Sequence, residues 1–326
     1  MLICDANQRA RNTSEAKAME AYMRGISDSQ ELKDDITNVS VGDLYEKFIG
    51  ADSEYSDADI VLFGAPFDST VSFKSGTRLG PSTMRHESIG IETYSPYQKI
   101  DLVDVKVHDS GDLDLTFNDS SRMVDLIEEK STSILSDDKI PFLIGGEHLV
   151  TLGNVRAAIK FFPNLRIIHF DAHADLRNDY NGKQLSHACI MRRCHDLLGD
   201  GRIWQFGIRS GTRDEFEFIK DGHVVSELFT IKTLPKVSFP KDTPVYLTVD
   251  MDVIDPSELP GTGTQEACGI HFKELMDALI DVIERFNVVA LDNVELSPPI
   301  DPTGRSTALA CKLLREELLA LGRKKK

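Results

Sequence analysis

From Asp59 onward, short runs of apolar residues alternate with longer amphipathic stretches. The runs are rich in Val, Ile and Phe and too short for typical helices, so each is typical of a buried strand. Strands that alternate with amphipathic helices indicate a parallel sheet with crossover helices. We predict eight strands: Ile60–Phe63, Val103–Val107, Pro141–Ile144, Arg166–Phe170, Ile203–Ile208, His223–Val225, Val245–Val249 and Val288–Asp292.

Two helices stand out near the end of the chain. The segment Phe272–Phe286 has apolar residues at the i, i+3, i+4, i+7 spacing of one buried helix face. A second helix is predicted over Arg305–Leu321, and we expect it to stop at Gly322. The basic tail that follows suits a solvated helix end better than a nucleic-acid site, because the remainder of the chain is acidic.

Residues 1–57 form a polar, acidic stretch in which only Glu15–Met23 resembles a helix. We interpret this stretch as an N-terminal extension. No internal repeat or linker divides residues 58–326, so they are expected to form one α/β domain.

Composition and charge narrow the classes of function. Hydrophobic residues make up 41% and charged residues 28% of the chain, as in ordinary folded proteins. The net charge of -16 disfavours nucleic acid or an anionic membrane as partner and suits a cationic substrate. No apolar run is long enough to cross a bilayer and the N-terminus lacks a signal-like stretch, so we expect a cytoplasmic location. Five cysteines without a Cys-x-x-Cys pair indicate reduced thiols.

Three predicted strands run directly into polar residues. The strand Arg166–Phe170 leads into Asp171, His173 and Asp175, which are spaced two residues apart and so share one face if the chain stays extended. A strand ending at Val249 leads in the same way into Asp250 and Asp252.

The third strand ends in the Gly-Gly-Glu-His segment at 145–148, whose glycines allow the backbone to turn tightly. In parallel sheets, ligands bind beyond the carboxyl ends of the strands. We therefore expect His148 to lie with the other polar residues at one edge of the sheet.

Any one of these short motifs is more often a turn or a cap than a metal site. Together they offer four carboxylates and two imidazoles without a thiolate, a set that suits Mn²⁺ better than structural zinc. Six ligands are too many for one open catalytic ion but fit two ions that share carboxylates and activate a water molecule. The pattern thus predicts a binuclear hydrolase.

The chain resembles the arginase, agmatinase and ureohydrolase family. The resemblance rests on Gly-Gly-Glu-His at 145–148, Asp-Ala-His-Ala-Asp at 171–175, Asp-x-Asp-x-x-Asp-Pro at 250–256 and Pro-Gly-Thr-Gly-Thr at 260–264. It extends from the segments at 64–68 and 76–81 to Glu-Leu-Ser-Pro at 295–298 and the last helix. It implies a three-layer α/β/α fold on an eight-stranded parallel sheet, with 58–326 as the catalytic domain, and assembly into trimers or hexamers.

The resemblance also implies roles for single residues. Two Mn²⁺ ions per chain would be held by two overlapping ligand sets, His148, Asp171, Asp175 and Asp250 for one ion and Asp171, His173, Asp250 and Asp252 for the other. His187 matches the histidine that relays protons to the leaving amine, a role suited to a pKa near neutrality. Glu295 matches the carboxylate that binds the guanidinium group, and Thr264 matches a residue near the substrate.

His169, Asp255 and Asp292 are interpreted as structural or supporting residues. The chain has Ala188 and Cys189 after His187, where many relatives have Gly-Thr or Ser-Thr, so helix packing there is expected to differ.

The implied reaction is the hydrolysis of a guanidino group with release of urea. Arginases have an Asn that binds the substrate carboxylate two positions after the last Asp of the 171–175 motif, but here that residue is Arg177. The neighbouring segments look more like those of bacterial agmatinases, so agmatine is the expected substrate, hydrolysed to putrescine and urea. Two alternatives stay open: guanidinobutyrate or arginine as substrate, since Arg177 can pair with a carboxylate, and a non-catalytic metal-binding protein of the same fold.

Overall fold

The computed structural model describes residues 47–116 and 118–325. Within this part of the chain lies an eight-stranded sheet of order β4-β1-β5-β10-β9-β6-β7-β8, in which every pairing is parallel. The strands are β1 (Ile60–Ala65), β4 (Val107–Asp112), β5 (Ile140–Gly145), β6 (Arg166–Phe170), β7 (Ile203–Ile208), β8 (Val225–Leu228), β9 (Pro244–Asp250) and β10 (Asn287–Val294). The predicted fold class is confirmed.

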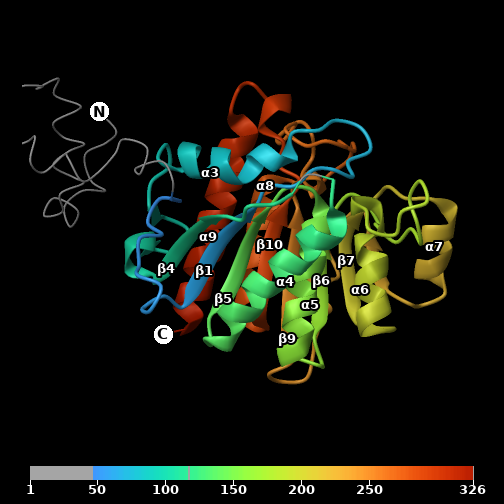
Figure 1. The fold of residues 1–326 in the computed structure, drawn as a ribbon, viewed down its shortest axis with the longest axis horizontal. Helices are drawn as coiled ribbons and strands as arrows, with labels where there is room; N and C mark the ends of the chain where they lie inside the picture. Colours follow the sequence, from blue (N-terminus) through green and yellow to red (C-terminus); the bar gives the residue numbers. More distant parts are fainter. Residues whose placement is uncertain (1–46, 117, 326) are drawn as a thin grey trace, which may run out of the picture.

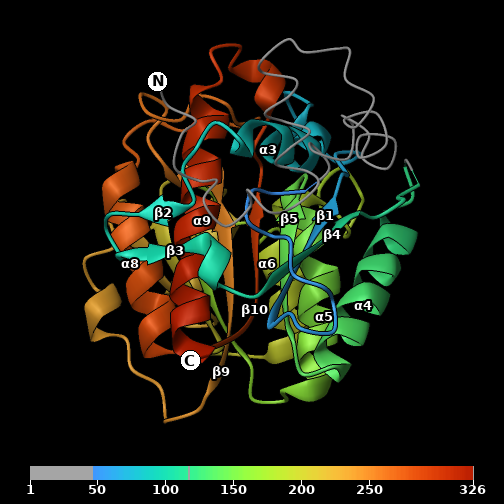
Figure 2. The same ribbon diagram turned by 90° about the vertical axis from the view of Figure 1, so that its left-hand side faces the viewer.

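Helices cover both faces of the sheet (Figures 1 and 2). They are α3 (Gly80–Ser88), α4 (Ser120–Ser136), α5 (Thr151–Phe161), α6 (Ile190–Leu198), α7 (Arg213–Lys220), α8 (Phe272–Arg285) and α9 (Arg305–Lys325). Figure 2 shows α8 and α9 on one side of the sheet and α4 and α5 on the other, and α6 packs in the same core as α4 and α5. The structure therefore has three layers, α/β/α.

The alternation of side chains along each strand explains the two cores. In β1, Ile60 and Leu62 pack in the core that includes α8 and α9, whereas Val61 and Phe63 pack in the core that includes α4, α5 and α6. Both faces are buried, so most positions of a central strand are apolar. This is why the strands appear in the sequence as continuous apolar runs.

Short elements complete the fold. A two-stranded antiparallel sheet pairs β2 (Tyr94–Ser95) with β3 (Ile100–Asp101). Single 3-10 turns occur at η3 (Thr77–Leu79), η4 (Leu102–Asp104), η5 (His148–Val150), η6 (His187–Cys189), η7 (Leu234–Lys236), η8 (Met251–Val253) and η9 (Pro298–Ile300). Three of these turns, η5, η6 and η8, begin at or next to a candidate site residue.

Two strand predictions were misplaced. The strand predicted at Val103–Val107 begins only at Val107, because the side chain of Asp101 accepts a hydrogen bond from the Val103 N–H and caps the turn η4. The strand predicted at His223–Val225 is β8, which starts pairing with β7 at Val225.

The helix predicted over Phe272–Phe286 is α8, which is confirmed. The expected stop of the last helix at Gly322 is wrong, since α9 continues to Lys325. A Cβ at residue 322 would lie 2.3 Å from Cγ1 of Val105, so the glycine allows α9 to pack closely on the chain before β4. Here glycine serves close packing rather than helix termination.

The first described residues already contact the domain. Phe48 and Ala51 are buried, and the Phe48 N–H donates a 2.8 Å hydrogen bond to Oδ2 of Asp109. The helix-like stretch Glu15–Met23 lies outside the described residues, and the division of the chain at residue 57 stays a prediction. None of the described helices is long and apolar enough to span a membrane.

Candidate active site

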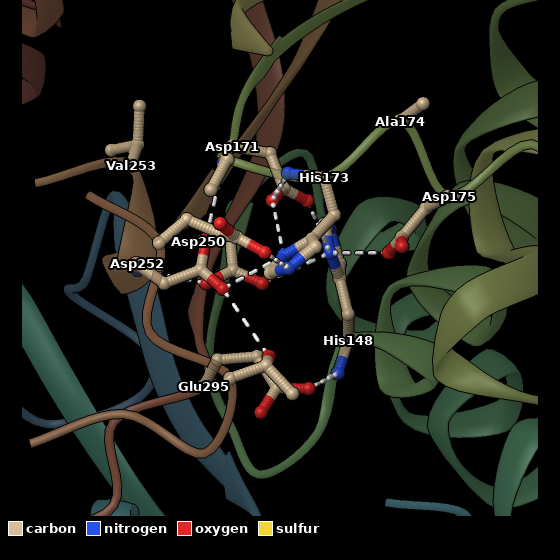
Figure 3. Close-up of polar contacts among 12 residues, drawn as sticks. His148, Asp171, His173, Ala174, Asp175, Asp250, Asp252, Val253 and Glu295 are labelled. Carbon is tan, nitrogen blue, oxygen red and sulfur yellow. Dashed lines mark hydrogen bonds and ion pairs between the residues drawn. The ribbon is translucent and has the colours of Figure 1, made fainter. Parts of the chain in front are cut away.

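Four neighbouring strands end at one place on the edge of the sheet. Asp171 follows β6, Asp250 is the last residue of β9, Glu295 follows β10, and His148 lies three residues beyond the end of β5. These strands are adjacent in the order β5-β10-β9-β6. Their parallel direction brings all four carboxyl ends to the same edge, so the side chains converge as expected (Figure 3).

Three carboxylates surround one ring nitrogen of His148. Its Nδ1 lies 3.1 Å from Oδ2 of Asp171, 3.2 Å from Oδ2 of Asp175 and 3.3 Å from Oδ2 of Asp250. On the other side of the ring, Nε2 is 3.1 Å from the hydroxyl of Thr248. Nδ1 is buried and, among the described residues, none makes a hydrogen bond to it of acceptable geometry.

A second group forms around His173. Its Nδ1 lies 2.9 Å from Oδ2 of Asp252 and 3.5 Å from Oδ1 of Asp171. Asp171 therefore belongs to both groups, with Oδ2 toward His148 and Oδ1 toward His173. Asp250 is joined to the second group because its Oδ1 accepts a 2.9 Å hydrogen bond from the Asp252 N–H.

The arrangement requires positive charge. Burial and the neighbouring Asp171 raise the pKa of Asp175 to about 7, and burial raises the pKa of Asp250 well above its usual range. With all four carboxylates ionised, the two imidazoles cannot balance their charge, so the ionised cluster favours bound cations. Multivalent cations would satisfy the Nδ1 atom of His148 and the surrounding oxygen atoms, and the donor set fits hard divalent ions.

His169 supports the cluster through a hydrogen bond to Asp171. Gln205 uses its Nε2 amide to donate both to the Ala174 carbonyl at 2.8 Å and to Nδ1 of His169 at 3.0 Å. The proton of the neutral ring is then on Nε2, which donates a 2.8 Å hydrogen bond to Oδ2 of Asp171. Burial lowers the pKa of His169, which favours this neutral form. His169 thus orients Asp171, a kind of support typical of metal-site carboxylates.

Backbone strain occurs at two of these positions. Asp175 has φ 53° and Glu295 has φ 65°, backbone angles that residues other than glycine seldom adopt. At Glu295 the strained backbone is held by a 2.8 Å hydrogen bond from its N–H to the Gly146 carbonyl. Such strain persists where surrounding contacts impose it and is frequent at functional sites.

His187 lies apart from the two groups around His148 and His173. Its backbone N–H donates to the Thr70 hydroxyl at 3.1 Å, and its Nδ1 is 3.4 Å from that same oxygen. The ring meets Tyr180 edge-on with centroids 5.8 Å apart. Burial lowers the pKa of His187 to about 4, so the imidazole is neutral at neutral pH.

Two further residues are connected to His187 by polar contacts. No sequence motif singles out Thr70, and Glu147 lies in the motif at 145–148 without a role of its own. In the structure both the N–H and the hydroxyl of Thr70 donate to the Glu147 carboxylate, at 2.7 and 2.5 Å. The one sequence signal for Thr70 is its position in the polar loop that follows β1, at the same edge of the sheet.

A cavity of about 350 Å³ opens in front of these groups. Its lining includes His173, Asp175, His187, Asp250, Thr264 and Glu295. Thr264 lies near the second group, with its hydroxyl 3.5 Å from Oδ2 of Asp252. The cavity wall also includes Arg177, Tyr180 and Glu215, so side chains of both charges face the space that a substrate would occupy.

Comparison with known proteins finds a matching family and relatives that cover most of the chain. Residues 58–320 match the sequence profile of the arginase family. An agmatinase from Bacillus subtilis is 44% identical over 276 residues, which covers 83% of this chain and 95% of the relative. A guanidinobutyrase from Pseudomonas aeruginosa is 33% identical over 287 residues, covering 82% of this chain and 88% of the relative.

Solved structures agree with the sequence matches. The agmatine ureohydrolase of Thermoplasma volcanium superposes with a TM-score of 0.81 at 33% identity, covering 91% of this chain and 99% of that chain. The region that matches the family profile contains every candidate site residue from His148 to Glu295.

Proposed function

The chain belongs to the arginase family and is a ureohydrolase, and we propose that its reaction is the hydrolysis of agmatine to putrescine and urea. The observation that carries this proposal is the meeting of a buried carboxylate cluster, a neutral histidine and a separate carboxylate, Glu295, around one cavity. A guanidinium cation can enter such a cavity and find both a binding carboxylate and a proton carrier.

The same proposal includes two Mn²⁺ ions per chain. His148, Asp171, Asp175 and Asp250 would hold one ion, and Asp171, His173, Asp250 and Asp252 would hold the other. The proposal is supported by the sharing of Asp171 between the two groups and by the lack of thiolate ligands. When bound, two such ions lower the pKa of a water molecule and position it as a nucleophile.

Metal counting tests this part. The His173→Ala variant is expected to retain about half of the metal of the unaltered protein and to lose most activity, because it lacks a ligand of only one group. His271→Ala, which removes an exposed imidazole paired with Glu258, is the matched control. Equal metal content and activity in His173→Ala and His271→Ala would contradict the ligand assignment.

The remaining site residues would act directly on substrate. Glu295 would bind the guanidinium group through charge-assisted hydrogen bonds and hold its carbon in line for attack. His187 would transfer a proton to the departing amine nitrogen as the C–N bond breaks. Thr264, beside Asp252, would contact the same end of the substrate.

The surroundings of Arg177 support agmatine over a substrate with a carboxylate. Its Nε lies 3.4 Å from Oε2 of Glu215, and its guanidinium lies 5.0 Å from the centre of the Tyr180 ring. Because this cation already has a partner, it is poorly placed to bind the carboxylate of guanidinobutyrate or arginine. The relatives named agmatinase support the same choice.

A substrate comparison tests the choice. We expect the purified, Mn²⁺-loaded full chain to release urea from agmatine with kcat/KM at least about tenfold above the values for guanidinobutyrate and arginine. Arg177→Gln should leave that order unchanged. A preference for guanidinobutyrate that Arg177→Gln abolishes would reverse the substrate assignment but not the family.

We also propose that the chain forms a homotrimer or a hexamer, as the family resemblance implies. Light scattering coupled to size exclusion would measure the mass of the assembly, and a monomer would contradict the proposal.

A further inference from the structure

The buried carboxylate of Glu147 and the hydroxyl of Thr70 lie next to His187. Glu147 is completely buried and receives both donors of Thr70, the N–H on Oε2 at 2.7 Å and the hydroxyl on Oε1 at 2.5 Å. The Thr70 hydroxyl oxygen in turn accepts the His187 N–H at 3.1 Å and lies 3.4 Å from Nδ1 of the same residue. Glu147, Thr70 and His187 therefore form one chain of polar contacts.

Counting protons along this chain gives its direction. The Thr70 hydroxyl donates to Oε1 of Glu147, and the Thr70 N–H donates to Oε2 of the same carboxylate, so both of these hydrogen bonds run from Thr70 to Glu147. Threonine has a single hydroxyl proton. When Glu147 receives it, the oxygen of Thr70 can only accept, so a hydrogen bond between Thr70 and Nδ1 of His187, 3.4 Å away, requires Nδ1 to be the donor.

We propose that Thr70 and Glu147 are positioning residues that hold His187 as the tautomer protonated on Nδ1, with Nε2 left as a free base. No described residue forms a hydrogen bond to Nε2, and His187 lines the cavity. The inference rests on the proposed role of His187 as proton carrier. Nε2 would accept a proton from the attacking water as the C–O bond forms. It would pass that proton to the departing amine as the C–N bond breaks, so the ring ends neutral.

The opposite arrangement has a candidate donor. The Ser186 hydroxyl also lies 3.4 Å from Nδ1 of His187. If Ser186 donated to Nδ1, the proton of the neutral ring would be on Nε2 and the ring could not accept a proton from the cavity. The two arrangements differ in which ring nitrogen is protonated, a property that can be measured without turnover.

Nitrogen-15 NMR of the full chain, labelled in histidine and loaded with diamagnetic Mg²⁺ so that no paramagnetic ion broadens the signals, measures it directly. The His187 signals are identified by their loss in His187→Asn, and we expect Nδ1 to show the shift of a protonated ring nitrogen and Nε2 that of a bare one. The reverse pattern would overturn the inference. Because the spectrum does not depend on catalysis, this result stands or falls separately from the choice of substrate.

Glu147→Gln is the sharpest variant. Its amide oxygen must accept the Thr70 N–H, so its NH₂ group faces the Thr70 hydroxyl, which then donates its proton to Nδ1. The His187 tautomer should switch, with kcat falling on the order of 10²- to 10⁴-fold and KM little changed. Thr70→Ser keeps the hydroxyl and should keep the tautomer protonated on Nδ1, while metal content is measured in each variant. A Glu147→Gln protein with full metal, unswitched tautomer and normal kcat would refute the inference.

Discussion

The backbone N–H of His148 donates a 2.8 Å hydrogen bond to Oε1 of Glu295, across the paired strands β5 and β10. The reverse connection is the 2.8 Å bond from the Glu295 N–H to the Gly146 carbonyl. Two loops from distant parts of the chain are thus tied together in both directions. One carboxylate oxygen of Glu295 is used for structure, and in the described part of the chain its other oxygen has no hydrogen-bond partner and is available for substrate.

Because only one oxygen of Glu295 bonds to the described part of the protein, the effect of Glu295→Gln can be predicted. The amide oxygen can still accept the His148 N–H, so the loop and the metal content should be preserved. Loss of the charge should weaken guanidinium binding by about 1.5–3 kcal/mol, which is roughly 10- to 100-fold in kcat/KM. Steady-state urea release from agmatine measures the change. Unaltered kcat/KM at full metal occupancy would show that Glu295 does not bind the guanidinium.

The convergence of these side chains was predictable because the candidate ligands follow strand ends. Asp171 and Asp250 come directly after apolar runs, and parallel strands bring such positions to one edge regardless of loop details. The ligand spacing of two residues added the positions of His173 and Asp252. Periodicity and strand direction are local properties, so the sequence displays them.

The supporting residues depend on tertiary contacts that no local pattern shows. Thr70 reaches His187 across 117 positions of the chain, and Gln205 supports His169 across 36. Gly322 looked like a helix stop because glycine often is one, but here it makes room for Val105. In each case the chemical role depends on a neighbour that only the fold supplies.

Because Glu317 is buried, we expect the free energy of unfolding of the protein to depend on pH. Burial raises the pKa of Glu317 to about 8, and the Asn293 amide donates to it at 2.6 Å. Unfolded glutamate titrates near about 4.3, so the folded state binds the extra proton. This contribution to stability is complete below pH ~4.3 and is lost as the pH rises through about 8.

The matched variant is Glu317→Gln, a neutral side chain of the same shape. The difference in unfolding free energy between the variant and the unaltered protein should shift in favour of the variant by about 2–3 kcal/mol as the pH rises from 6 to 9, since the variant has no charge to bury. Denaturant unfolding at both pH values measures the difference. A pH-independent difference between the two proteins would show that Glu317 titrates normally.

The burial of Cys189, two residues beyond His187, predicts that the site resists thiol reagents. Its side chain is buried, its thiol lies 3.8 Å from the Lys183 carbonyl, and burial raises the pKa of Cys189 to about 11. Little thiolate exists at pH 7.5, so alkylation by iodoacetamide should be on the order of 10²-fold slower than at the exposed Cys268. Peptide mass spectrometry over time measures both rates. Cys268→Ser should remove the fast modification and leave urea release unchanged, whereas inactivation that parallels Cys189 labelling would show that this thiol is exposed by opening of the site.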